Sequence, residues 1–255
     1  MNKDEKDYKE FLVKPEEDEE YQKLLKKMEE ARKEDEEKQL KDKERMKKLH
    51  EFESTYAYYL NLRSLYIDKL EEFRNEVAKN EAYKQYSKGG ETIHRGYYYP
   101  GLVLDLIAKG ASRGSLYKRM PKNVKYSYEY TFDKNGRMIK SLQRGEGNCS
   151  PIEEYFLYEK NAVISFIFEH GLQYITKCDY ENDNLIMYTY VRFRFGRTSN
   201  NIAEYRCEKY SYENGLFKVS NRYTILVNEG FSFIRHCREI FERDEEGYID
   251  YYIGG

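Results

Sequence analysis

The chain has 255 residues and is 35% charged, yet its 44 basic and 46 acidic residues nearly cancel. This balance excludes the bulk basic charge that draws whole proteins to nucleic acid or to anionic membranes. Tyrosine is unusually frequent, with 28 Tyr beside 13 Phe, no Trp and only 4 Pro. Many tyrosines with few prolines favour β-strands, in which the ring packs on the sheet and the hydroxyl stays in water.

No segment has the pattern of a membrane anchor. The first seven residues contain no apolar run, so we expect no signal peptide. The longest strongly apolar run, residues 101–108, is too short to cross a bilayer and includes Asp105. We therefore predict a cytoplasmic protein with no membrane partner, in which the cysteines are free thiols.

The N-terminal part is predicted to be helical and charged. Pro15 followed by the acidic run Glu16–Glu20 indicates a helix start, because proline suits the first helical position and acidic side chains complement the helix dipole. From about Arg32 to Lys48 the apolar stripe nearly disappears. This stretch is typical of a solvated helical spacer held by ion pairs between neighbouring turns.

A heptad pattern follows this spacer, with steps of three and four residues and one polar interruption at Arg63. The pattern indicates either a coiled coil, which predicts a homo-oligomer through residues 49–77, or a helix packed along a sheet. Its bulky aromatic residues favour packing on a sheet or on a preceding helix. Ser87-Lys88-Gly89-Gly90 is expected to end the helix. The heptad positions are Leu49, Phe52, Tyr56, Tyr59, Arg63, Tyr66, Leu70, Phe73 and Val77.

Residues 91–123 are predicted to be a connector with one short helix, from Leu102 to Lys109, between Pro100 and Gly110. The chain then becomes basic from 111 to 144, with tyrosines interleaved. Nucleic-acid binding is therefore one alternative function, with cations on phosphates and rings stacked on bases. The candidate contacts are Arg113, Lys118, Arg119 and Lys122.

Strands are predicted from Val124 onwards. Apolar and polar residues alternate from Val124 to Phe132, and Asn135-Gly136 supplies a tight turn. Short Asn, Gly and Asp turns then recur, which indicates a meander of roughly eight to ten antiparallel strands. The later strands are expected at Glu154–Tyr158, Ala162–Phe168, Leu172–Lys177, Leu185–Phe195, Glu204–Tyr212, Leu216–Val227, Phe231–Phe241 and Tyr248–Ile253.

These elements predict an α+β fold in which a long N-terminal charged, coiled-coil-like helix precedes an antiparallel multistranded β-meander of hairpin repeats. The expected organisation is a helical segment over 1–90, the connector over 91–123 and the β-meander over 124–255.

The four cysteines recur with a period. Cys149, Cys178, Cys207 and Cys237 are spaced 29, 29 and 30 residues apart, which predicts a reused hairpin unit with each thiol at an equivalent small buried position. No CxxC spacing is present, so we expect no metal and no cofactor.

Catalytic signatures are also missing, which predicts a protein that is not an enzyme. Of the four histidines, His94 and His236 are the two candidates for a functional cleft.

Two turn motifs resemble known repeat families. Tyr130-Thr131-Phe132-Asp133-Lys134-Asn135-Gly136-Arg137-Met138 resembles a YD/RHS-type repeat, and Tyr212-Glu213-Asn214-Gly215-Leu216-Phe217-Lys218 resembles the variant MORN repeat of antitoxin-like proteins. The resemblance covers residues 124–255 and implies stacked hairpins. It further implies a bacterial immunity protein whose partner is a polymorphic toxin.

The leading functional prediction is a non-enzymatic protein-binding module, of immunity or adaptor type, that holds a partner protein on its sheet face. Tyrosine and arginine are the side chains most enriched at interface hot spots. The candidate partner contacts are Tyr97, Tyr98, Tyr99, Arg192, Arg194, Asp244, Glu245 and Glu246.

Overall fold

The chain divides into two compact units, residues 1–51 and residues 52–255. The computed structural model describes residues 22–23, 26–31, 33, 43–88, 115–120, 122, 127–144, 150–194, 201–228, 231–243 and 249–254. Every described residue of the first unit is helical. The second unit contains most of helix α3 (Lys43–Tyr66), helix α4 (Leu70–Asn80) and all described strands.

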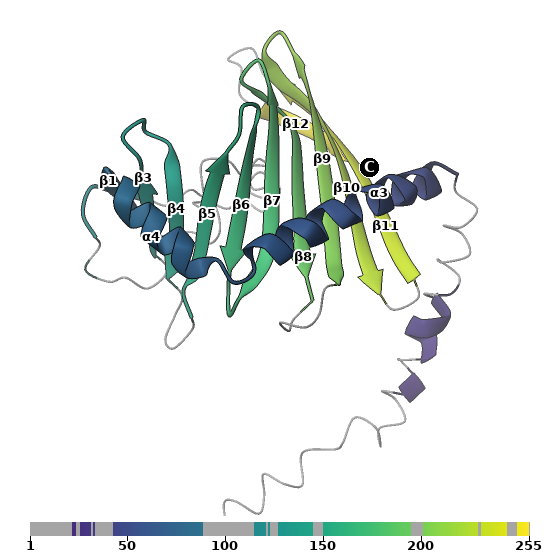
Figure 1. Cartoon of the computed structure of the whole chain (residues 1–255). Helices are drawn as coiled ribbons and strands as arrows, with labels where there is room; N and C mark the ends of the chain where they lie inside the picture. The colour runs from purple at the N-terminus through teal and green to yellow at the C-terminus, as the bar shows by residue number, and fades with distance from the viewer. Residues whose placement is uncertain are drawn as a thin grey trace, which may run out of the picture. The chain divides into compact units, whose positions relative to one another are not determined.

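Twelve strands form one sheet in which every neighbouring pair is antiparallel (Figure 1). From β3 to β12 the order in the sheet follows the order in the chain, so this part is a meander, as predicted. β1 lies between β3 and β2 at one edge. The strands are β1 (Tyr83–Lys88), β2 (Ser115–Tyr117), β3 (Ser127–Phe132), β4 (Met138–Arg144), β5 (Ile152–Tyr158), β6 (Ala162–Phe168), β7 (Leu172–Glu181), β8 (Asn184–Phe193), β9 (Ile202–Glu213), β10 (Leu216–Asn228), β11 (Phe231–Arg243) and β12 (Ile249–Gly254).

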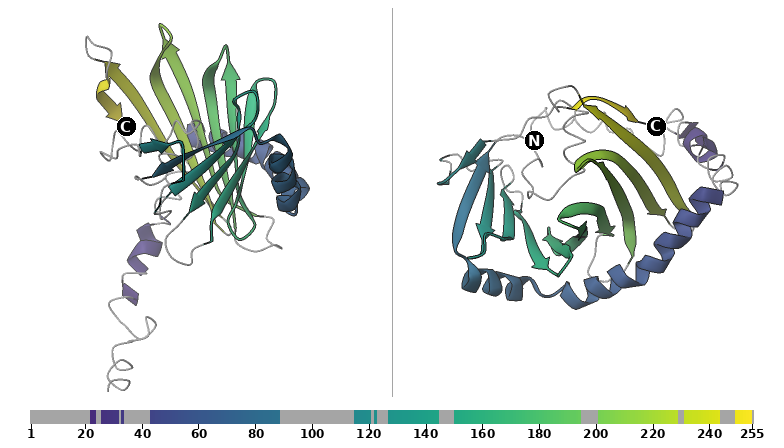
Figure 2. Two further views of the ribbon diagram at one scale, coloured as in Figure 1. Left: turned by 90° about the vertical axis from the view of Figure 1, so that its left-hand side faces the viewer. Right: turned by 90° about the horizontal axis from the view of Figure 1, so that it is seen from above.

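The predicted fold class is wrong. The described chain is mostly antiparallel sheet, and no long N-terminal helix is present among the described residues. The helical part is broken after Tyr66, where the Lys69 N–H donates to the Tyr66 carbonyl at 3.1 Å before α4 begins. A continuous helix over the heptad positions 49–77 would be straight for roughly 43 Å. The break lets the two helical pieces follow a sheet that curls (Figure 2).

The sheet also includes segments that we assigned to the helix end and to the connector. β1 pairs with β3 over its whole length, from Tyr83 opposite Phe132 to Lys88 opposite Ser127. Side-chain packing explains why β1 is a strand. The Tyr83 ring stacks on Phe132 at 4.8 Å, and the hydroxyl of the fully buried Ser87 lies 3.3 Å from the Tyr130 hydroxyl. Cross-strand aromatic contacts of this kind outweigh the weak helix signal of a short segment.

We call residues 52–80 the helical strap. It lies along the outer side of the curled sheet (Figure 2) and crosses the strands one after another. The Phe52 ring lies 4.8 Å from Tyr205 of β9. Further along the strap, the Tyr66 and Phe73 rings lie 4.3 Å and 5.4 Å from Phe166 of β6. The heptad positions therefore form the sheet-facing side of the strap, and they pack on the sheet of their own chain.

The polar interruption of the heptad pattern also faces the sheet. Arg63 is 3% exposed, and its guanidinium carbon lies 4.9 Å from the centroid of the Phe193 ring in β8. Burial lowers the pKa of Arg63 from its ordinary value. A guanidinium over an aromatic face keeps a favourable electrostatic contact inside an apolar layer.

Tyrosine hydroxyls tie the hairpins together at equivalent places. The Tyr158 hydroxyl at the end of β5 donates to the Met138 carbonyl at the start of β4, at 2.8 Å. The Tyr212 hydroxyl near the end of β9 donates to the Leu185 carbonyl near the start of β8, also at 2.8 Å. Each hydroxyl satisfies a carbonyl next to a turn, which explains why tyrosine precedes so many of the turn motifs.

The turns themselves use residues that tolerate positive φ. Asn214 and Gly215 have φ of 52° and 76°, and Asn182 and Asp183 have φ of 49° and 64°. Two consecutive residues of this kind twist a hairpin in the sense that matches the strands. The turn pattern read from the sequence is thus confirmed at these positions.

Removing an aromatic ring from the strap should destabilise the fold. We expect Phe73→Ala to lower the free energy of unfolding by about 2–3 kcal/mol, because the ring packs on Tyr155 and Phe166 and a cavity remains. Denaturant titration of the full chain measures this. Leu65→Ala is the matched control, since Leu65 on the same strap is 56% exposed. Equal effects of the two substitutions would contradict packing of the strap on the sheet.

Loss of one of these tyrosine hydroxyls should destabilise the fold less than loss of the Phe73 ring. We expect Tyr212→Phe to destabilise the protein by about 1 kcal/mol, because the Leu185 carbonyl loses its donor while the ring packing is kept. Tyr117→Phe on the exposed strand β2 serves as the control and should change thermal stability little. A neutral Tyr212→Phe would show that water replaces the hydroxyl.

Candidate functional site

The two faces of the sheet have different surroundings. Residues directly opposite each other on neighbouring strands point to the same face. Tyr205 and Phe166, which contact the strap, therefore define an outer face. In each strand, the residues that alternate with the outer-face residues point the other way, to the inner face. The strap covers the middle of the outer face, whereas on the inner face Leu226 of β10 and Arg235 of β11 are exposed.

Three rows of side chains cross the inner face. They follow from the pairing register of β7 with β8, β8 with β9, β9 with β10 and β10 with β11. The first row is Tyr174, Arg192, Glu204 and Leu226; the second is Thr176, Tyr190, Arg206, Thr224 and Arg235; the third is Cys178, Tyr188, Glu208, Arg222 and Cys237.

Arginines and tyrosines of the first two rows make one cluster. Glu204 accepts at one oxygen from Arg192 Nε and at the other from an Arg206 Nη, both at 3.2 Å. The Arg206 guanidinium carbon lies 5.3 Å from the centroid of the Tyr190 ring, which lies 5.6 Å from the Tyr174 ring. The arginine–tyrosine cluster consists of Tyr174, Tyr190, Arg192, Glu204 and Arg206.

The arginine side chains of the cluster are held in place and are also partly exposed to solvent. The Arg192 and Arg206 side chains are 39% and 28% exposed, whereas the Glu204 carboxylate between them is 13% exposed. The Glu204 carboxylate thus fixes the positions of both guanidinium groups, while the two arginine side chains remain partly exposed. Such a group can bind a planar anion through paired N–H donors.

Three residues of the third row, Cys178, Tyr188 and Glu208, are buried. Glu208 is fully buried and accepts from the Tyr210 hydroxyl at 2.6 Å. Burial, reinforced by the nearby Glu208 charge, raises the pKa of Tyr210 far above its ordinary value. Burial also raises the pKa of Cys178 to about 12, so this thiol stays protonated and is not a nucleophile at neutral pH.

Formal charges on the inner face alternate in sign. Within the three rows, four arginines (Arg192, Arg206, Arg222 and Arg235) stand against two glutamates, Glu204 and Glu208. Both glutamates lie on β9 with Arg206 between them. Glu208 is fully buried, so the three rows have an excess of cations near the surface, and Glu204 lies between two of them.

The predicted partner contacts have different places in the structure. Arg192 belongs to the arginine–tyrosine cluster, whereas an Arg194 Nη donates to the Val227 carbonyl of β10 at 2.8 Å and so ties strands together. Tyr97, Tyr98, Tyr99, Asp244, Glu245 and Glu246 lie outside the described residues.

The candidates for nucleic-acid contact lie at the other end of the sheet. Lys118, Arg119 and Lys122 are exposed and follow the edge strand β2, and Arg113 lies outside the described residues. Nothing in the register brings them to the three rows.

Four residues of the cluster were missed from the sequence: Tyr174, Tyr190, Glu204 and Arg206. The alternation around Arg192 identified its face, but the pairing partner of each strand position depends on turn lengths and bulges. One such bulge lies between Arg192 and Phe193 in the pairing of β8 with β9. Sequence alternation alone does not locate it.

The cysteines do not occupy equivalent positions. Cys178 and Cys237 belong to the same inner row, whereas Cys207 lies opposite Tyr223 on the outer face, beside Tyr205. The period of one cysteine per hairpin holds from β7 to β11, but the odd spacing places Cys207 on the other face. Cys149 lies outside the described residues, and among the described ones no three His, Cys, Asp or Glu side chains form a metal-binding group.

Of the two histidines that were candidates for a cleft, His94 and His236, only His236 falls within the described part of the chain. Its ring stacks on Tyr223 at 4.4 Å, on the outer face. His94 lies outside the described residues.

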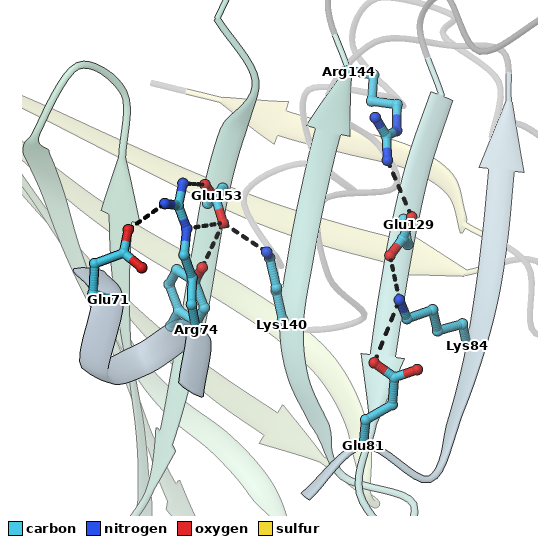
Figure 3. A network of polar contacts seen from close by, with 9 residues as sticks. Glu71, Arg74, Glu81, Lys84, Glu129, Lys140, Arg144 and Glu153 are labelled. Carbon is cyan, nitrogen blue, oxygen red and sulfur yellow. Dashed lines mark hydrogen bonds and ion pairs between the residues drawn. The ribbon is translucent and has the colours of Figure 1, made fainter. Parts of the chain in front are cut away.

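A network of ion pairs joins the strap to the sheet on the outer face (Figure 3). Glu153 of β5 accepts from Arg74 of α4, from Lys140 of β4 at 2.6 Å and from the Tyr155 hydroxyl. Burial alone would raise the pKa of Glu153, but the three donors outweigh it and lower the pKa from 4.5 to about 2. The carboxylate is only 8% exposed, so this network is an anchor for α4.

A second group of ion pairs lies beside it, where Glu129 of β3 accepts from Lys84 of β1 and Arg144 of β4 (Figure 3). Lys84 also pairs with Glu81 at 3.4 Å. These contacts fasten β1 to the meander across β3.

No protein-family model matches the sequence, and no curated protein is significantly similar to it. The resemblance of the turn motifs to YD/RHS-type and variant MORN repeats therefore stays a prediction. Among the described helices, none combines the length and apolar character needed to cross a bilayer.

The strap anchor should depend on pH. Because the folded pKa of Glu153 lies below its ordinary value, its stabilising contribution is present above pH 4.5 and is lost as the pH falls toward 2. We expect Glu153→Gln to destabilise the protein by about 3 kcal/mol at neutral pH, since Arg74 and Lys140 lose their shared anion. Urea titrations between neutral pH and pH 3 should show this difference narrowing in acid.

The matched control is Glu71→Gln, which removes the exposed partner of the same Arg74. Its effect should stay below about 0.5 kcal/mol. A pH-independent loss in Glu153→Gln would show that packing, and not the charge, is responsible.

Proposed function

We propose that the chain is a non-enzymatic, cytoplasmic protein-binding module of immunity or adaptor type, which holds a partner protein on the inner face of its sheet. The observation that carries the proposal is the arginine–tyrosine cluster, in which two partly exposed guanidinium groups are ordered by one carboxylate and one aromatic ring. The repeat resemblance adds a bacterial toxin as the expected class of partner.

Residue chemistry supports protein binding at this place. Tyrosine and arginine supply large contact area and several hydrogen bonds from side chains that lose little freedom when already packed. Tyr174 and Tyr190 are half-buried, their rings lie 5.6 Å apart at an interplanar angle of 33°, and the Arg206 guanidinium lies against the Tyr190 ring. An ordered pair of this kind is a suitable anchor for an interface.

Nucleic-acid binding is the second candidate. Lys118, Arg119 and Lys122 are exposed near Leu116 and Tyr117 of the edge strand, where cations and an aromatic ring lie together. On the inner face, however, the Glu204 carboxylate lies between Arg192 and Arg206. A phosphate placed on these arginines would meet that carboxylate, so the inner face favours a protein.

Assembly through residues 49–77 has less support, because Phe52, Tyr66 and Phe73 are engaged with the sheet of their own chain.

The proposal is tested by capture with matched variants of the full chain. Immobilised wild type, Arg192→Ala/Arg206→Ala and Arg238→Ala are incubated with lysate of the source organism, with and without nuclease treatment. Arg238 is exposed on β11 but belongs to none of the three rows, so it is the control. We expect one stoichiometric protein on the wild type and on Arg238→Ala, and at least a tenfold loss on the double variant.

Equal recovery of that protein on all three baits would overturn the inner-face proposal. Material that disappears from the wild type on nuclease treatment would support the nucleic-acid candidate instead.

A further inference from the structure

We propose that helix α4 is a lid, which opens by local unfolding while α3 stays packed, and that its opening uncovers the outer face of β5 and β6. The inference concerns the outer face, so it does not depend on the function proposed for the inner face. It rests on the difference in burial between the two helices of the strap and on the contacts that remain in the sheet when α4 leaves.

The two helices of the strap differ in how deeply their side chains are buried. Within the strap, α3 places Phe52, Tyr59 and Arg63 against the sheet, each no more than 4% exposed. None of the 11 residues of α4 is buried. Because the stabilisation from packing grows with the apolar area that is buried, α4 is the part of the strap held least strongly. Its three most covered apolar side chains are only half-buried: Leu70, Phe73 and Val77.

Helix α4 has little stability of its own. Its N-cap residue, Lys69, makes no side-chain hydrogen bond to the first turn. An isolated helix of about eleven residues is marginal in water, so α4 depends on docking to the sheet.

Both ends of α4 join segments that are fixed independently of it. The Ile67 N–H donates to the Arg63 carbonyl at the end of α3, and the Ala82 N–H donates to the Phe132 carbonyl of β3, both at 2.8 Å. The chain between these two bonds can therefore unfold without moving α3 or β1 from the sheet.

Opening does not leave an unpaired charge in the sheet. Arg74 of α4 donates to Glu153, which also accepts from Lys140 at 2.6 Å and from the Tyr155 hydroxyl (Figure 3). When α4 opens, Arg74 passes to water and Glu153 keeps the other two donors. The large penalty of a buried carboxylate without a partner is thus avoided. What opening loses is one ion pair and the packing of Phe73.

The surface under α4 is aromatic. The Phe73 ring lies 5.1 Å from Tyr155, 5.4 Å from Phe166 and 6.0 Å from Phe168, and these three side chains are at most 3% exposed. Tyr66 at the end of α3 also contacts Phe166, at 4.3 Å. Since α3 stays packed, opening chiefly uncovers Tyr155 and Phe168. The lid thus controls access to an aromatic patch on β5 and β6.

Native-state amide hydrogen exchange of the full chain at several low urea concentrations tests the inference. We expect the amides of residues 74–80 to exchange at least about tenfold faster than those of residues 59–66, after correction for intrinsic rates. Urea should accelerate the α3 amides steeply and the α4 amides little, because local opening exposes little surface.

Two matched glycine substitutions separate local from global opening. Ala57 in α3 and Ala78 in α4 are both exposed, and replacing either by glycine destabilises its helix. We expect Ala78→Gly to speed exchange of the α4 amides about two- to fivefold. Ala57→Gly should speed exchange of the α3 amides and leave that of the α4 amides unchanged.

Thiol labelling tests whether the patch is uncovered. A Phe168→Cys variant is labelled under native conditions, and the modified peptide is followed by mass spectrometry. Ala78→Gly should speed labelling at position 168, whereas Ala57→Gly should not.

Three results would overturn the inference. The first is equal protection of the α3 and α4 amides with the same dependence on urea. The second is an Ala57→Gly variant that speeds the α4 amides as much as Ala78→Gly does, since the strap would then open only as a whole. The third is labelling at position 168 that both glycine variants speed equally, which would show that the patch is reached only by global unfolding.

Discussion

Packing of the helical strap on the outer face is the contact on which the rest of the structure depends. An antiparallel sheet must cover its apolar face to be stable alone. Residues 52–80 do this with a line of aromatic rings that meets β9 first, then β6 and β5. Arg74 then pairs with Glu153 of β5 at the far end. One element therefore fixes the curvature and the mutual positions of about half the strands.

The strap also determines where the chain enters the sheet. Because α4 ends near the first strands of the meander, β1 follows it directly and pairs with β3. This places β1 outside the order expected from the chain and explains why the sheet is larger than the meander alone. Ion pairs from Lys84 and Arg144 to Glu129 stabilise the junction at the place where β1 joins. Packing of the strap on the sheet thus both covers the outer face and brings β1 to the edge of the meander.

Much of the local structure could be predicted from the sequence, because it depends on short-range rules. Ala162–Phe168 was identified as a strand with the same bounds as β6, and the Asn-Gly turns with positive φ were placed correctly. The heptad positions identified the buried side of the helices. The helix break after Tyr66 was not predictable, because it follows from the curvature of a sheet whose strands all lie further along the chain.

The candidate site was less predictable for the same reason. Arg192 was found from alternation within its own strand, but its partner Glu204 lies on another strand beyond the Arg192–Phe193 bulge. The face of each cysteine likewise depends on the parity of residues across two turns, so the 29-residue period did not show that Cys207 faces outward. Which side chains meet across neighbouring strands therefore could not be predicted from the sequence alone.

The two sets of ion pairs in the protein show how folding and binding are divided between the faces. Glu153 is surrounded by three donors and almost inaccessible, so its charge is fully used within the chain. Glu204 has two donors, and one of them, Arg192, is more than a third exposed. A buried, saturated carboxylate contributes to stability and has no capacity for a further ligand. An ion pair with exposed cations contributes little to stability, so the Glu204 cluster and the Glu153 network differ in what they contribute to the fold.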